Sequence, residues 1–328
     1  MVSGSLIRTK EKILDSKNKS SISCCILGAG AIGMIFASYF KRIGMKVYVI
    51  HHRNMPKTVF EVQVCDSDLS GNYSFEVVVP ESIEETDFIL VTTKATEVLN
   101  ALEGIKNVLR NGSDVVILSN GMGFHEKAQQ TYRSARIFAA TTTEAAHISQ
   151  PKIINHSATG RTVIGEISSK KSPDWLPIWL NAIPDSSWTQ DIKTALWEKL
   201  SINCVINPLT ASHECRNGEL IENPILKELA KDLCLEIEMV IDAAKIPHAK
   251  EPLFDIVSKV IFDTATNFSS MFQDVKAERT TEIESITGYL VETAALFKVD
   301  VPMNNKLLKQ LQDTRFSPIF IKTNDDAT

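Results

Sequence analysis

The hydrophobic pattern of this chain has one period in its first half and another in its C-terminal part. From Ser21 onward, short apolar runs rich in β-branched residues alternate with stretches of helical period, which is typical of a parallel sheet covered by helices. The first repeat predicts a strand over residues 22–27, a helix over 31–43 and a strand over 46–50. These elements make one βαβ unit.

The alternation continues further along the chain. It predicts a strand over 88–93, a helix over 97–109 and a strand over 114–119. Two more β-rich runs within 152–167 flank turn-forming residues at 157–160. We expect these runs to form a hairpin that finishes the sheet with antiparallel strands.

After residue 190, almost all of the sequence has the period of helices. Helices are predicted over 191–211, 224–245, 251–267, 272–297 and 303–314. The fold class is therefore α/β, an N-terminal Rossmann-type doubly wound sheet followed by an all-helical C-terminal domain. The expected parts are an N-terminal extension (1–21), the Rossmann domain (22–190), a helical substrate domain (191–318) and a C-terminal tail (319–328).

Length and charge narrow the classes of function. A chain of 328 residues is long enough for two domains, and 44% apolar with 23% charged residues is typical of a folded globular protein. The net charge of −5 argues against a general binder of nucleic acid or of anionic membranes. No apolar run approaches the roughly 18–20 residues that span a bilayer. We expect a small-molecule partner and a monomer or homodimer.

The cysteines and the N-terminal residues bear on localisation. The six cysteines lie in apolar surroundings without C-x-x-C spacing, so neither a disulfide framework nor a metal site is expected. Residues 1–20 mix basic and acidic side chains and lack the apolar core of a signal peptide. A cytoplasmic protein with reduced thiols is the expectation.

A glycine-rich turn stands between the first strand and the first helix. It reads Gly28-Ala29-Gly30-Ala31-Ile32-Gly33. In a G-x-G-x-x-G turn the glycines permit tight bending and close backbone approach to a pyrophosphate, which the helix N-terminus then faces. The alternative is a plain βα turn, but the flanking strand and helix favour dinucleotide binding.

The end of the second strand bears on the choice of cofactor. A site that prefers NAD normally has Asp or Glu there to hold the ribose 2′-hydroxyl. This chain has His51, His52 and Arg53 instead. A guanidinium can neutralise a 2′-phosphate, so NADP(H) is the predicted cofactor. The alternative is a solvated basic turn.

Three polar side chains recur at every fourth position of the helix predicted from residue 191. Lys199, Asn203 and Asn207 fall on one face, and Pro208 follows them directly, where we expect the helix to loosen. A ketone that receives a hydride needs a proton donor beside its oxygen and groups that orient the acid. This face offers both, although an amphipathic helix with a polar outer face explains it equally well.

Two further stretches hold polar residues with simple structural explanations. Ser270 and Gln273 fit a capping box, so a helix N-terminus explains the serine without a ligand. Glu282 falls in a charge-dense predicted helix, where a solvated face is the simplest explanation. Asn120 and Lys94 end predicted strands at the carboxyl edge of the sheet, where doubly wound folds bind ligands, although a turn and a surface lysine are the alternatives.

Taken together, four blocks of the sequence resemble the ketopantoate reductase (2-dehydropantoate 2-reductase) family over roughly residues 22–315. They are ILGAGAIG (26–33), SNGMG (119–123), WEKLSINCVINPLTA (197–211) and SSMFQDVKAERTTEIESITGYL (269–290). The order and separation of the blocks match the family pattern. The two C-terminal blocks are far more specific than the glycine turn.

The resemblance implies a role for each polar residue. It makes Lys199 the general acid that protonates the keto oxygen, with Glu282 supporting this role and substrate binding. Substrate would bind to Asn203, Asn207 and Ser270. Lys94 and Asn120 would line the junction of nicotinamide and substrate. The implied reaction is NADPH-dependent reduction of ketopantoate to pantoate for pantothenate and coenzyme A synthesis.

One position departs from the family pattern, and two other functions stay open. Eight residues beyond Gly44, where the family usually has arginine, this chain has His52, with Arg53 one place later. An enzyme of the same fold that acts on another 2-keto acid, such as a D-2-hydroxyacid dehydrogenase, is the first alternative. The second is a sensor that binds NADPH without catalysis.

Overall fold

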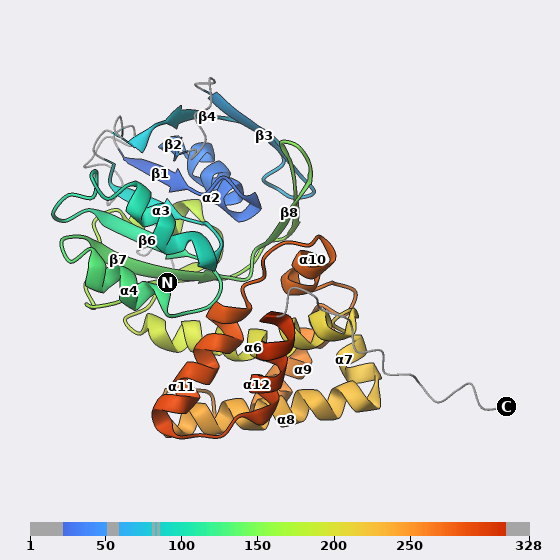
Figure 1. Ribbon diagram of the computed structural model, residues 1–328. Coiled ribbons are helices and arrows are strands. Elements are labelled where there is room, and N and C mark those ends of the chain that lie inside the picture. The colour runs from blue at the N-terminus through green and yellow to red at the C-terminus, as the bar shows by residue number, and fades with distance from the viewer. Residues whose placement is uncertain (1–21, 51–58, 81–82, 84–85, 313–328) are drawn as a thin grey trace, which may run out of the picture. The chain divides into compact units, whose positions relative to one another are not determined.

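The computed structural model describes residues 22–50, 59–80, 83 and 86–312 (Figure 1). The chain divides into two compact units. The first unit comprises residues up to Ser119 together with His125–Ile192, and the second comprises Asn120–Phe124 together with the residues from Lys193 onward. The short segment Asn120–Phe124 therefore packs with the C-terminal unit, although it follows a strand of the first.

An 11-stranded sheet organises the first unit, in the order β11-β10-β7-β6-β5-β1-β2-β4-β3-β9-β8. Its strands are β1 (Ser23–Leu27), β2 (Lys46–Ile50), β3 (Val59–Cys65), β4 (Gly71–Val78), β5 (Phe88–Val91), β6 (Asp114–Leu118), β7 (Arg136–Thr142), β8 (Ala145–Gln150), β9 (Ile153–Ala158), β10 (Thr162–Glu166) and β11 (Ser186–Trp188). The run from β7 through β6, β5, β1 and β2 to β4 is parallel throughout.

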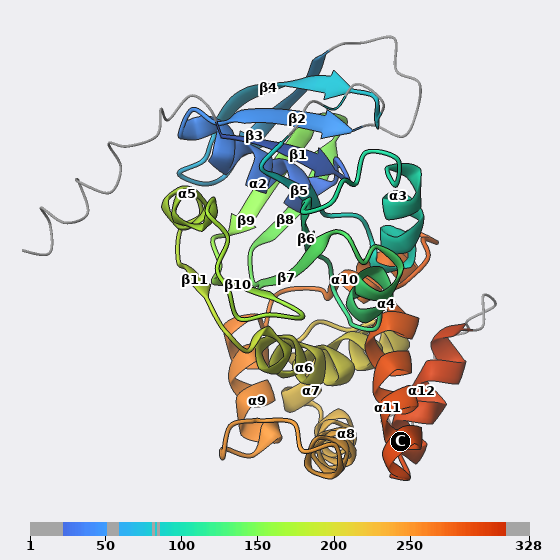
Figure 2. The ribbon, with the colours of Figure 1, turned by 90° about the vertical axis from the view of Figure 1, so that its left-hand side faces the viewer.

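Helices lie on both faces of this sheet. They are α2 (Ala31–Arg42), α3 (Val98–Gly104), α4 (Phe124–Thr131) and α5 (Leu176–Ala182), with a 3-10 turn, η2 (Ala95–Glu97), before α3. Figure 2 shows α2 and α5 on one face and α3 and α4 on the other. Strands β1, β5 and β6 are buried along their whole length, as strands covered on both faces must be. The predicted doubly wound sheet is confirmed.

The predicted hairpin over residues 152–167 is wrong. β9 pairs with β3 and β8, whereas β10 pairs with β7 and β11, so the two strands lie near opposite ends of the sheet. The turn residues indicated a break between strands but not which partners the strands would take. Gly160 has another reason to be glycine, because a Cβ there would lie 2.2 Å from the carbonyl carbon of Thr143.

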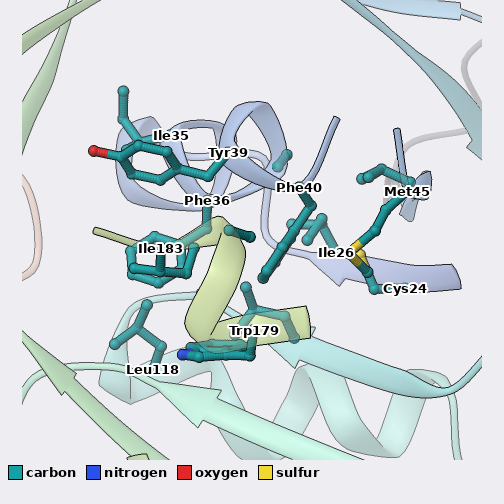
Figure 3. Packing of buried hydrophobic residues seen from close by; sticks show 14 of the residues in the cluster. Cys24, Ile26, Ile35, Phe36, Tyr39, Phe40, Met45, Leu118, Trp179 and Ile183 are labelled. Carbon is teal, nitrogen blue, oxygen red and sulfur yellow. The ribbon is translucent and has the colours of Figure 1, made fainter. Parts of the chain in front are cut away.

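The core of the first unit forms where α2 and α5 pack on β1 (Figure 3). Trp179 of α5 is fully buried, with ring centroids 5.8 Å from Phe36 and 5.4 Å from Phe40, both on α2. Trp175, one turn earlier, donates from Nε1 to the carboxylate of Asp114 at 2.7 Å. Aromatic packing thus holds α2, whose N-terminus carries the glycine turn, against the sheet.

Helices make up the second unit. They are α6 (Ile192–His213), α7 (Glu219–Glu222), α8 (Pro224–Ala243), α9 (Leu253–Asp263), α10 (Ser270–Lys276), α11 (Tyr289–Phe297) and α12 (Pro302–Gln312), with a π-helical turn, η3 (Glu284–Gly288), before α11. α8 contacts α7, α9, α11 and α12. The all-helical character predicted for this part is confirmed, and no helix among the described residues could cross a membrane.

The single helix predicted over 272–297 is wrong. α10 ends at Lys276, and Glu278 adopts a left-handed backbone with φ of 53°. The chain then turns back, because the Arg279 amide donates to the carbonyl oxygen of Asp274 at 2.8 Å. Glu282 therefore lies outside a helix, just before η3. The charged residues of this stretch suit a helix, and only the contacts around Asp274 interrupt it.

Candidate active site

The glycine turn of the first unit is held tightly against the neighbouring strand. Gly28 has φ of 118°, and a Cβ there would lie 2.8 Å from the carbonyl carbon of Thr92 and 2.8 Å from the amide nitrogen of Thr93. The Thr92 hydroxyl donates to the Gly28 carbonyl at 2.7 Å. Gly33 is also enclosed, since its Cβ would lie 2.2 Å from the Gly28 oxygen. Any larger residue at either position would push the turn off β5.

Gly30 has different surroundings. It precedes α2 in an extended conformation, with φ of −80° and no side-chain capping bond at the helix N-terminus. A Cβ on Gly30 would meet nothing within 4 Å. The first turn of a helix has amide groups without intrahelical partners, and the helix dipole favours an anion there. A pyrophosphate therefore fits this turn, close to Gly30.

Lys94 is another predicted cofactor residue of the first unit. Lys94 follows β5 at the carboxyl edge of the sheet and precedes η2. The ends of β5 and β6 are tied together there, because the Ser119 hydroxyl donates to the Thr93 carbonyl at 3.0 Å. His52 and Arg53 lie outside the described residues.

In the second unit, the polar residues of α6 do not form a solvated face. Asn207 is buried, with 7% of its surface exposed, and Lys199 and Asn203 are half-buried. α6 continues through Pro208 without an interruption in its helical span. A buried amide needs hydrogen-bond partners, so burial of Asn207 favours a functional or structural role over a plain outer face.

Glu282 lies close to two other predicted site residues. Its Oε2 accepts a hydrogen bond from the side-chain amide of Asn120 at 3.0 Å. Glu282 also interacts electrostatically with Lys199. Loss of hydration lowers the pKa of Lys199 from 10.5 to about 8, and the Glu282 carboxylate opposes this shift. The structure thus brings Asn120, Lys199 and Glu282 together from three separate parts of the chain.

The π-helical turn fixes the segment that carries Asn120. The Met122 amide donates to the Ser285 carbonyl at 2.8 Å. Gly121 has φ of 86°, and a Cβ there would lie 2.4 Å from that same oxygen. Glycine is therefore required on both steric and conformational grounds. π-Helical turns often accompany functional sites, and here η3 begins two residues after Glu282.

Glu282 is one of the residues that line a small hollow in the second unit. Its lining residues are Asn207, Ser270, Met271, Asp274, Glu282 and Ile286. Four of the six carry polar side chains, three of which were predicted from the sequence. Asp274 was not predicted. Its position four residues after Ser270 in α10 is the signal that could have indicated it, because residues at that spacing share a helix face.

The predicted capping box at Ser270 is wrong by one residue. Ser269 precedes α10, and its hydroxyl accepts from the Phe272 amide at 3.1 Å. The hydroxyl of Thr210 in turn donates to Ser269 at 2.7 Å. Ser269 therefore caps the helix, and Ser270 is an exposed residue that lines the hollow. Two adjacent serines offer the same cap from sequence alone, and only packing against α6 distinguishes them.

A larger hollow lies elsewhere in the first unit. It opens at the amino-terminal ends of β5 and β6, where Val108, Arg110 and Asp114 contribute to its lining. The glycine turn lies at the opposite, carboxyl edge of the same strands. The larger hollow therefore takes no part in the site described above.

Two family models match the chain, and they cover most of its length. The model described as ketopantoate reductase PanE/ApbA matches residues 24–169, and the model of the C-terminal part of the same family matches residues 191–314. The chain belongs to the ketopantoate reductase family. The resemblance noted in the sequence is therefore confirmed.

The sequences of individual members of the ketopantoate reductase family align with most of this chain. The 2-dehydropantoate 2-reductase of Shigella flexneri is 34% identical over 291 residues, which cover 88% of this chain and 93% of that protein. The enzyme of the same name from Aquifex aeolicus is 28% identical over 300 residues, covering 88% and 95%. Relatives from distant bacteria thus share the same length and order of parts.

Solved structures share the fold. The 2-dehydropantoate 2-reductase of Methylococcus capsulatus superimposes with a TM-score of 0.76 at 22% identity and covers 88% of this chain and 95% of its own. A D-mandelate dehydrogenase in a ternary structure with NADH and anilino(oxo)acetate gives a TM-score of 0.76 at 19% identity, covering 89% and 98%. At such identities the likeness establishes the fold alone.

Proposed function

We propose that this protein reduces 2-dehydropantoate (ketopantoate) to pantoate with NADPH, a step of pantothenate and coenzyme A biosynthesis. The observation that carries the proposal is the grouping of Lys199, Glu282 and Asn120. A lysine of lowered pKa near a carboxylate and an amide is the arrangement that protonation of a keto oxygen requires. Family membership and the names of the full-length relatives supply the substrate.

The Lys199 ammonium group is the proton donor in this proposal. With a pKa of about 8, it is mostly protonated at pH 7 yet releases its proton more readily than an ordinary lysine. Glu282 keeps the ammonium group charged and holds the Asn120 amide by a hydrogen bond. The proton passes from Nζ to the oxygen that becomes the C2 hydroxyl, and the neutral amine then takes a proton from water.

The substrate itself would be held by Asn203 of α6 and by polar side chains that line the hollow. Asn203, Asn207 and Ser270 supply amide and hydroxyl groups that suit the carboxylate and the 4-hydroxyl of ketopantoate. A substrate with an apolar side chain would leave these amide and hydroxyl groups without hydrogen-bond partners. The polar lining therefore favours ketopantoate over a 2-keto acid without a hydroxyl group.

The first unit would hold the cofactor. Bound NADPH supplies the hydride. The residues from Gly28 to Gly33 would hold the pyrophosphate at the N-terminus of α2, and Lys94 would lie toward the nicotinamide. We assign the 2′-phosphate to His52 and Arg53 because both follow β2 in sequence. The fit at Gly30, where a Cβ would meet nothing, supports the pyrophosphate position.

A D-2-hydroxyacid dehydrogenase is the second candidate function, because a D-mandelate dehydrogenase shares the fold. A panel of 2-keto acids, each assayed with NADPH and with NADH, separates the two. We expect ketopantoate with NADPH to give the highest kcat/KM. Faster reduction of a bulky acid without a hydroxyl group, or a preference for NADH, would contradict the proposal. Cofactor binding without oxidation by any acid would indicate a sensor.

A further inference from the structure

The first unit contains a hydrogen-bonded series of polar side chains that is distinct from the glycine turn. His156 of β9 contacts the Glu144 carboxylate through Nε2, and both side chains are fully buried. The other ring nitrogen, Nδ1, lies 2.9 Å from the hydroxyl oxygen of Ser67, in the turn between β3 and β4. A carboxylate, an imidazole and a hydroxyl group therefore follow one another in a single series.

The Glu144 carboxylate decides which nitrogen of His156 carries the hydrogen. An ionised carboxylate only accepts hydrogen bonds, so the hydrogen of a neutral ring lies on Nε2 and the lone pair lies on Nδ1. Ser67 then donates its hydroxyl proton to Nδ1. His156 is thus placed as a base for Ser67, and Glu144 fixes its tautomer, which is the relation of these three groups in serine hydrolases.

Two further contacts hold Glu144 in place. The Tyr39 hydroxyl donates to Oε1 at 3.3 Å, and the Glu144 amide donates to Thr142 Oγ1 at 3.2 Å. Figure 3 shows the Tyr39 oxygen pointing away from Phe40 and Trp179. Burial raises the pKa of Tyr39 to about 12, and the charge of Glu144 adds to the rise, so the phenol keeps its proton and stays a donor.

The turn between β3 and β4 holds the Ser67 hydroxyl in one position. Asp66 has a left-handed backbone with φ of 69°, and its carboxylate accepts from the Asn155 side-chain amide at 2.5 Å. Leu69 is buried, and its backbone amide donates to the Ser67 hydroxyl oxygen at 3.2 Å. Ser67 itself is half-buried, so it is the member of the series that solvent reaches.

A second serine–histidine pair in the same sheet has no such orienting group. Ser157 Oγ lies 3.3 Å from His147 Nδ1, and both residues are exposed. Among the described residues, no carboxylate contacts His147. Either nitrogen of its ring can carry the hydrogen, so this histidine is not held as a base for Ser157. The pair is a natural control for the buried series.

We propose that Ser67, His156 and Glu144 form a second catalytic centre, in which a nucleophilic serine transfers acyl groups from small activated esters to water. The Ser67 oxygen attacks the ester carbonyl while its proton moves to His156 Nδ1. That proton leaves with the alcohol as the ester C–O bond breaks, which gives an acyl-serine. His156 then takes a proton from water, whose oxygen attacks the acyl carbon, and Ser67 regains that proton as the acid departs.

Labelling of the full-length protein tests the nucleophile directly. A fluorophosphonate reacts with serines that have a base held in place, and mass spectrometry of the peptides locates the adduct. We expect an adduct at Ser67, at least about tenfold more than at Ser157, and its loss in His156→Gln. No adduct in the parent protein, or equal adducts at the two serines, would overturn the inference.

Hydrolysis of p-nitrophenyl acetate tests turnover. Ser67→Ala should lower the protein-catalysed rate by about tenfold or more, whereas Ser157→Ala should keep the parental rate. Reduction of ketopantoate should be the same in both variants, since the inference does not depend on the reductase function. A parental rate of ester hydrolysis in Ser67→Ala would overturn the inference.

A cysteine variant replaces His156→Gln if that protein does not fold. With His156 acting as a base, the thiol of Ser67→Cys should react with iodoacetamide about tenfold faster than that of Ser157→Cys. Peptide mass spectrometry separates each engineered thiol from the native cysteines. Equal rates at the two positions would show that the buried series only supports the turn, and would overturn the inference.

Discussion

The two units position their predicted binding residues in different ways. In the first, a run of six residues from Gly28 to Gly33 forms the turn, and its geometry depends on backbone atoms and the adjacent strand. In the second, Asn120, Lys199 and Glu282 come from distant segments. A site made of backbone can be recognised from a short motif. A site made of side chains depends on packing throughout the unit, so its residues look ordinary in sequence.

Replacing Lys199 by alanine should produce the largest effect and would act on the second unit alone. Loss of a general acid typically lowers turnover by about 10²–10⁴-fold. NADPH affinity, measured by fluorescence titration, should stay near that of the parent protein. Lys193→Ala, at an exposed position earlier in α6, is the matched control and should retain activity. Near-normal turnover in Lys199→Ala would contradict the assigned role.

The glycine turn can be tested by two alanine variants that separate folding from cofactor binding. In Gly33→Ala the Cβ would lie 2.2 Å from the Gly28 oxygen, so we expect a loss of stability of about 1–3 kcal/mol as well as weaker NADPH binding. In Gly30→Ala the Cβ meets no protein atom within 4 Å, so the thermal midpoint should hold while the Kd for NADPH rises by about tenfold to a hundredfold. Unchanged cofactor affinity in Gly30→Ala would argue against a pyrophosphate at this turn.

Gly121 and Gly112 make a similar pair that tests the π-helical turn. Both have φ of 86°, but a Cβ on Gly121 would lie 2.4 Å from the Ser285 oxygen, whereas one on Gly112 would meet nothing within 4 Å. Gly121→Ala should displace Asn120 and lower kcat/KM by about tenfold to thirtyfold. Gly112→Ala bears the same backbone strain and should leave kcat/KM unchanged. Equal losses in both variants would show that strain, and not the position of Asn120, is responsible.

The same contrast explains which parts of the molecule could be predicted from the sequence. Strand and helix periods predicted β1, α2, β5 and β6, because strands buried on both faces and amphipathic helices have local signatures. The separation of β9 from β10 could not be predicted, because strand pairing is a property of the whole sheet. The helix face of Lys199 suggested a proton donor only as one of two equal interpretations, and the role that we propose for Glu282 came from the family resemblance alone.

Arg279 and the true cap residue were beyond both kinds of prediction, whereas Asp274 was indicated only by its spacing of four from Ser270. Helix propensity favoured a continuous helix through Glu278, and no local rule marks a left-handed residue at a glutamate. The reversal is a local helix-end motif, in which the amides of Glu278 and Arg279 donate to the carbonyl oxygens of Val275 and Asp274 around the left-handed Glu278. Glycine usually occupies such a left-handed position, so a glutamate there gave no signal that the helix ends.

The pH dependence of kcat/KM measures the lowered pKa directly. Lys199 must be protonated to donate, so kcat/KM for reduction should be level below its pKa of about 8 and fall above it, approaching tenfold per pH unit. Glu282 raises this pKa, so Glu282→Gln should move the break to lower pH. A break near the ordinary lysine value of 10.5, or one that Glu282→Gln moves upward, would contradict the proposed pairing.

The smallest expected effects come from the two adjacent serines of α10, which separate support of the helix from contact with substrate. Ser269 accepts from the Phe272 amide and from the Thr210 hydroxyl, so Ser269→Ala should cost about 1 kcal/mol of stability in urea unfolding. Ser270 lines the hollow without capping, so Ser270→Ala should leave stability unchanged and raise KM for ketopantoate by about fivefold, the loss of one hydrogen bond. The reverse outcome, a stability loss at Ser270 and a KM effect confined to Ser269, would mean that the cap lies one residue later and that the sequence pattern of Ser270 with Gln273 was correct.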